Sequence, residues 1–150
     1  MKPAIIFAAP HRLLFLVGAA QLIALLGWWL VVLIALHFGT PFLAEGTIPR
    51  SLLHAPLLIY LALPPLFFGF LLTVFPRWMG YPDLAKLSYA PVSLGYAAAA
   101  LLVWAALGAG NDALLALAFA AALLTNLWGA AALLRIAMRE RLDRKGPTWH

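Results

Sequence analysis

The sequence predicts an all-α fold, a polytopic membrane protein built as a four-transmembrane-helix bundle in a single membrane domain (1–150). Of the 150 residues, 65% are hydrophobic and 10% are charged, and the mean hydropathy is +0.98. A soluble domain has about 25% charged and about 45–50% apolar residues, so this composition excludes a water-soluble globule. The aromatic content of 13% excludes a disordered chain. The absence of cysteine excludes disulfides, thiolate metal sites and iron–sulfur clusters.

Four apolar stretches are long enough to cross a bilayer, whose hydrocarbon core of about 30 Å needs about 20 helical residues. We predict spans at about 13–37, 52–75, 88–107 and 113–134, with a cytoplasmic basic tail at 135–150. Glycine, proline, asparagine and aspartate mark the turns between them. The first stretch exceeds the apolar core of a signal peptide, which is about 7–15 residues long, so we predict an uncleaved span.

The distribution of basic residues predicts the orientation. With four spans, both termini and the connection between spans two and three lie on one side of the membrane. That side holds nine of the ten Lys and Arg residues, and the other side holds only Arg50. The nine are Lys2, Arg12, Arg77, Lys86, Arg135, Arg139, Arg141, Arg144 and Lys145. The positive-inside rule therefore predicts a multi-pass membrane protein with both termini cytoplasmic, and the basic charge indicates topology and not nucleic-acid binding.

Polar residues inside the spans are few and uncharged. No Asp, Glu, Lys or Arg lies within the predicted spans, which argues against a small proton-coupled exporter, because such exporters need a carboxylate in the membrane. We predict that Gln21, Thr125 and Asn126 face the bundle and hydrogen-bond between helices, because an unpaired amide in hydrocarbon is costly. The small residues of spans three and four predict close helix packing.

The second span contains Pro56, Tyr60 and the adjacent Pro64 and Pro65. A proline removes a backbone donor and bends a helix. We predict a bend at the proline pair, and two interpretations of it stay open. The bend serves packing, or it widens a cavity or cofactor pocket beside Tyr60.

Histidine is the side chain in this sequence that is suited to binding a transition metal or haem iron. His37, at the outer end of span one, and His54, near the outer end of span two, are expected to approach one another. His11 lies about 40 Å from His37 along the first helix, so it cannot share their site. For each histidine, a polar anchoring role is the alternative to a ligand role.

Two runs, APHRLLFLVGAAQLIALLGWW (9–29) and GFLLTVFPRWMG (69–80), resemble the NnrS family of bacterial membrane proteins. Between them, RSLLHAPLLIY (50–60) lies where the family has the histidine-bearing start of its second helix. The resemblance implies a haem- and copper-associated inner-membrane protein of nitric oxide metabolism and nitrosative stress in denitrifying bacteria. It implies that His11 and Arg12 belong to the opening motif and that His54 is the first histidine of the second-helix motif. Pro56 stands where many members have a second histidine, and members commonly have more spans than four.

Three functions follow as hypotheses, and enzymatic activity stays open. The first is a haem- or copper-binding protein of the nitric oxide response, with His54, His37 and His11 as cofactor-binding residues and His54 and His37 as metal ligands. The second is a non-catalytic accessory subunit or assembly factor of a membrane respiratory complex, in which the same motifs only pack helices. Transport of a small neutral molecule is the third. The expected partners are the lipid bilayer and other membrane subunits or a second copy of the chain.

Overall fold

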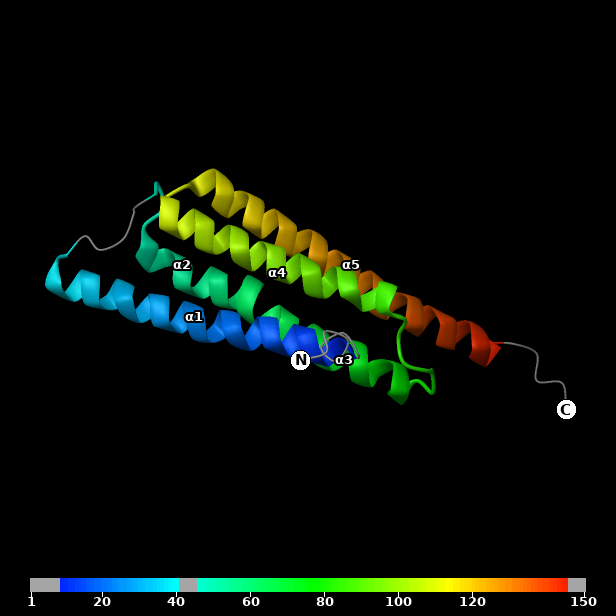
Figure 1. Cartoon of the computed structure of the whole chain (residues 1–150). Helices are drawn as coiled ribbons and strands as arrows, with labels where there is room; N and C mark the ends of the chain where they lie inside the picture. Colours follow the sequence, from blue (N-terminus) through cyan, green and yellow to red (C-terminus); the bar gives the residue numbers. More distant parts are fainter. Residues whose placement is uncertain (1–8, 41–45, 146–150) are drawn as a thin grey trace, which may run out of the picture.

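The computed structural model describes residues 9–40 and 46–145, and every regular element in these residues is a helix. The predicted all-α fold is therefore confirmed. Four helices are long and apolar enough to cross a membrane, as judged by length and composition. Figure 1 shows them side by side along one long axis, with the start of the first and the end of the last toward the same end of the bundle.

The first predicted span lies within α1 (Pro10–Phe38). Pro10 occupies the first helical turn, where its fixed φ and missing N–H are tolerated. The helix ends at Gly39, which has φ 63° and donates its N–H to the carbonyl of Ala35. Glycine suits this left-handed cap because it has no Cβ.

The second predicted span consists of three pieces, α2 (Arg50–Leu57), the π-helical η2 (Leu58–Ala62) and α3 (Leu63–Trp78). Leu63 donates its N–H to the carbonyl of Leu58, five residues back, instead of four. Pro64 and Pro65 follow immediately and have no N–H to donate. The helical ladder is thus irregular directly before the proline pair, where the sequence predicts a bend; the bend angle itself stays a prediction.

The third and fourth predicted spans lie within α4 (Lys86–Ala109) and α5 (Asp112–Lys145). A short connection joins them. Gly110 ends α4 with φ 63°, and the Asn111 side chain accepts the N–H groups of Ala113 and Leu114 at 3.0 and 3.1 Å. This is a regular helix N-cap. Beyond residue 134, α5 continues without a break through Lys145.

The bundle is assembled from two closely packed pairs, α1 with α3 and α4 with α5. Small residues permit the close approach. A Cβ at Gly69 of α3 would lie 2.8 Å from the Phe15 ring of α1, and a Cβ at Gly95 of α4 would collide with Thr125 of α5. Such contacts replace the hydrophobic drive that lipid does not supply between membrane helices.

The other helices leave most of α1 uncovered. Only 17% of the residues in its most hydrophobic 18-residue stretch are buried. Large apolar side chains are exposed along it: Phe15, Leu16, Ile23, Leu26, Leu30, Val31, Leu33, Ile34, Leu36 and Phe38. A surface of this kind is stable in a lipid bilayer and not in water.

Candidate functional site

His54 stacks on Trp29 near the start of the second span. The two ring centroids are 4.1 Å apart with an interplanar angle of 18°. α2 carries His54 and α1 carries Trp29, so the stack joins the first two spans. The histidine is half-buried, and its ring plane is held on one side by the indole.

The hydrogen bond of His54 determines which ring nitrogen is available. Nδ1 lies 3.1 Å from the carbonyl oxygen of Ser51, one turn back in α2. A carbonyl only accepts, so the neutral ring must carry its proton on Nδ1. The lone pair is then on Nε2. Histidine ligands of metals commonly have this arrangement, with the second nitrogen donating to a carbonyl or carboxylate.

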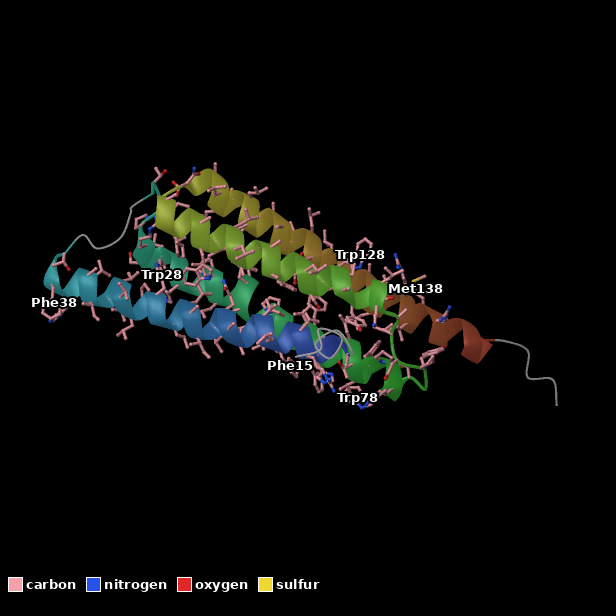
Figure 2. The ribbon with its side chains drawn as sticks, viewed as in Figure 1. Phe15, Trp28, Phe38, Trp78, Trp128 and Met138 are labelled. Carbon is pink, nitrogen blue, oxygen red and sulfur yellow. The ribbon has the colours of Figure 1, made fainter. Side chains whose placement is uncertain are left out.

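His37 is not brought to His54. The stack places His54 at the level of Trp29, which is eight residues before His37 on the same helix, so His37 lies about 12 Å farther along the axis. Its side chain is exposed and contacts the Phe38 ring edge to face. Figure 2 shows Phe38 at the extreme end of α1. The two histidines do not approach one another as expected. The distance between them is set by how α2 is positioned along the axis of α1, and not by the length of the connection between the two helices.

His11 lies at the other end of the bundle, about 27 Å from the level of Trp29. Its Nδ1 is 3.4 Å from the hydroxyl oxygen of Thr73 in α3. That hydroxyl already donates to the carbonyl of Gly69 at 2.8 Å, so in this contact His11 is the donor.

The His11–Thr73 contact joins the two runs that resemble the NnrS family. Gly69 and Thr73 belong to the second run, and Phe15 and His11 belong to the first. Phe15 covers Gly69 while His11 meets Thr73 one turn away. Figure 2 shows Phe15 and Trp78 toward this same end. The two runs, whose contacting residues are 54 and 62 positions apart in the sequence, therefore form one contact between α1 and α3.

The described histidines fit some metal groups and not others. Among the side chains that the structure describes, which end at Arg139, no group of three or more His, Cys, Asp and Glu is close enough to hold one metal ion. Nε2 of His54 would be the atom that holds a haem iron, or one ligand of a metal site that another chain completes.

Two interhelical hydrogen bonds cross the apolar interior, as predicted for the polar residues within the spans. Trp104 of α4 donates to the amide oxygen of Gln21 in α1 at 3.0 Å. Tyr96 of α4 donates to the amide oxygen of Asn126 in α5 at 2.8 Å. Thr125 instead donates to the carbonyl of Ala121 in its own helix at 2.7 Å. The tryptophan and tyrosine partners were not predicted, because an amphipathic aromatic residue in an apolar run has no distinctive signal.

Only one of the two polar atoms of the Gln21 amide has a hydrogen-bond partner among the described residues. Its Oε1 must face Trp104, because an indole only donates. Its Nε2 is buried and has no hydrogen-bond partner among the described residues. The side chain is 4% exposed, so this donor lies well inside the bundle.

Arg50 has a structural role that charge counting did not reveal. It is buried, and its Nη2 donates to the carbonyl of Leu107 near the end of α4 at 3.4 Å. Nearby, the backbone N–H of Thr47 donates to the Asp112 carboxylate at 2.7 Å. These contacts fasten the start of α2 to the connection between α4 and α5.

Tyr60 lies at the surface of the bundle beside Phe119 of α5. Tyr60 is 56% exposed, and its ring meets Phe119 edge to face at 6.4 Å. A cavity of about 530 Å³ lies at another place, next to the connection between α3 and α4, and Tyr60 does not line it.

An ion pair orders that connection. Arg77 donates from Nε and Nη2 to the two Asp83 oxygens at 2.9 and 3.1 Å. Both groups are exposed. The hydrogen bonds and positive charge of Arg77 lower the pKa of the Asp83 carboxyl below its usual value.

Four apolar helices with neutral polar pairs between them define a multi-pass membrane protein. A family model described as NnrS protein matches residues 5–147, so the chain belongs to the NnrS family. The match also covers α4 and α5, beyond the runs that carry the resemblance in sequence. Comparisons with the curated proteins and with the solved structures find no match.

Proposed function

We propose that this chain is an inner-membrane protein of the nitric oxide and nitrosative stress response that contributes His54 as a ligand to haem or copper. Membership in the NnrS family supports the physiological role. The observation that carries the ligand assignment is the hydrogen bond of His54, which commits Nδ1 to a carbonyl and leaves the Nε2 lone pair available.

His54 acts here as an oriented donor atom. The Trp29 stack and the Ser51 carbonyl together restrict rotation of its ring, which lowers the entropy lost when a ligand bond forms. A bound haem or copper would supply the redox chemistry or the nitric oxide binding. The second ligand comes from another copy of the chain or from a partner subunit, since His37 and His11 lie at other depths.

The orientation belongs to the same proposal. The nine-to-one distribution of basic residues supports cytoplasmic termini. His11 and Thr73 are then near the cytoplasmic face, and His54 lies toward the periplasmic side. Their separation by most of the membrane makes His11 a packing residue in this proposal.

Substitution of His54 tests the ligand assignment. Purified from its native membrane, the wild-type protein should show a Soret band or stoichiometric iron or copper, and His54→Ala should lose at least about 90% of it because the donor atom is removed. His11→Ala and His37→Ala, which remove the other two described histidines, should retain it. Circular dichroism checks that each variant is folded. Full occupancy in His54→Ala would contradict the assignment.

A second candidate function is that of a non-catalytic accessory subunit or assembly factor of a membrane respiratory complex. The absence of a cluster of three metal-binding side chains among the described residues favours it. So does the structural use of each motif histidine, with His54 in a stack and His11 in a helix contact. A colourless wild-type protein that copurifies with oxidase or reductase subunits supports this function over the first.

A further inference from the structure

The cavity beside the connection between α3 and α4 has two arginines on one wall. Its volume is about 530 Å³, and its lining includes Arg135 and Arg139 of α5 together with Asp83, Ser88 and Trp128. The arginines are four residues apart, so they share one face of α5 about one helical turn from each other. Both side chains are exposed, and neither forms an ion pair with a side chain that the structure describes.

We propose that this cavity is a binding site for the phosphate group of an anionic phospholipid, held between the guanidinium groups of Arg135 and Arg139. Two guanidinium groups on one helix face repel one another, and an anion between them removes that repulsion. Planar guanidinium groups also form paired, charge-assisted hydrogen bonds to phosphate oxygens. This site is more specific than the general attraction of a basic tail to a membrane surface.

The carboxylate in the lining does not oppose an anion. Both Asp83 oxygens accept hydrogen bonds from Arg77, so the charge of Asp83 is compensated outside the arginine pair. Ser88 adds a hydroxyl near the start of α4. The net charge that faces the cavity from the described side chains is therefore positive.

The apolar part of the cavity favours a lipid over free phosphate. Trp128 is 49% exposed on α5 (Figure 2) and lines the same cavity. It precedes Arg135 by seven residues, so it lies about 10 Å deeper along the helix axis. Tryptophan is common at the boundary between headgroups and hydrocarbon. A phospholipid places its phosphate at the arginines and its glycerol and upper chains along Trp128, whereas inorganic phosphate leaves this apolar wall exposed.

Native mass spectrometry of the full chain tests the proposal. The protein is released from micelles that contain equal amounts of phosphatidylglycerol and phosphatidylcholine, and the retained lipids are counted. Wild-type protein should retain phosphatidylglycerol preferentially. The variant with Arg135→Gln and Arg139→Gln should retain about tenfold less of it, because both charge-assisted contacts are lost. The single variants should lie between these values.

Lys86→Gln is the matched control. Lys86 is exposed at the start of α4 near the same connection, but it does not line the cavity. Its substitution removes one positive charge, as each single arginine variant does, and should leave lipid retention within about twofold of wild type. Equal losses in Lys86→Gln and Arg135→Gln would show general surface attraction and overturn the site.

A competition experiment with inorganic phosphate tests whether the site binds the phosphate group of a lipid or free phosphate. Millimolar phosphate should neither displace retained phosphatidylglycerol nor stabilise the protein by itself against thermal unfolding. Displacement by phosphate, or retention of phosphatidylcholine at the level of phosphatidylglycerol, would overturn the assignment to an anionic lipid. Thermal unfolding of the arginine variants also checks that their fold is intact, and the exposure of both side chains predicts no change.

Discussion

The bond from Trp104 to Gln21 is a hydrogen bond between two spans at the centre of the bundle. In hydrocarbon, neither the indole N–H nor the amide oxygen has water as an alternative partner, so each depends on the other. Gln21 Nε2, which has no acceptor in the described part of the chain, offsets part of this stabilisation, because a buried donor without an acceptor costs free energy. The pair therefore contributes more to the rotational register of α1 against α4 than to total stability.

A double-mutant cycle at this pair should measure a modest coupling. We expect Trp104→Phe to lower the free energy of unfolding by about 1–2 kcal/mol, because it leaves the Gln21 oxygen buried without a donor. In combination with Gln21→Leu, the effects should be less than additive, with a coupling of about 0.6–1.7 kcal/mol. Unfolding in mixed micelles supplies the measurement.

The matched control combines Gln21→Leu with Tyr96→Phe, because Tyr96 donates to Asn126 and not to Gln21. The effects of these two substitutions should add. Strict additivity in the Gln21 and Trp104 cycle would show that the 3.0 Å hydrogen bond has no energetic role.

Among the helices, the second span departs most from regular geometry. The π-helical η2 contains one residue more than the same turn of an α-helix. This extra residue rotates the residues that follow by about 100° around the helix axis. The segments on either side of η2 both contact α1. Before η2, His54 of α2 contacts Trp29, and after η2, Leu66 of α3 contacts Gly18. The π-helical turn allows both segments to present the required face to the same partner helix.

Replacement of Pro64 and Pro65 by alanine should remove this irregularity. The two new N–H groups restore the donors that the prolines lack, so a continuous α-helix becomes accessible. The flanking segments would then rotate relative to one another, and we expect a change in distance between spin labels at Leu52 and Phe67, which are both exposed. The labels are attached to cysteines introduced at these two positions, and because the chain has no cysteine of its own, they attach nowhere else.

Pro56→Ala is the control, since Pro56 lies in α2 before η2. It should leave the distance between the labels unchanged. An unchanged distance in the variant with both Pro64 and Pro65 replaced would show that the π-helical turn is set by packing against α1 and not by the prolines.

Hydropathy and turn residues predicted the individual helices well. The predicted spans at 13–37 and 88–107 lie within α1 and α4, and each of these helices ends at a left-handed glycine. The π-helical register of η2 was not predictable, because proline indicates only that two donors are missing. How the backbone compensates depends on the helix against which it packs.

The orientation of the whole molecule in the membrane can be tested directly with a reporter enzyme. An alkaline phosphatase reporter, active only in the periplasm, should be inactive when fused after His150 and active when inserted at Asn111 in the connection between α4 and α5. The nine-to-one charge distribution provides the reason. High activity after His150 would reverse the topology and move His54 to the cytoplasmic half.

The sequence by itself determined the fold class and the four helices, and it predicted the interhelical hydrogen bonds of Gln21 and Asn126 but not that Thr125 bonds within its own helix. These follow from composition and from local hydropathy, which are independent of how helices meet. Only the tertiary structure decided that His54 stacks on Trp29 while His37 remains two turns away, and that Arg135 and Arg139 line a cavity. The physical reason is that these helices are apolar around most of their circumference, as lipid requires. Hydrophobic periodicity then no longer marks the packed face or the depth of one helix against another, and both are set by which side chains fit together.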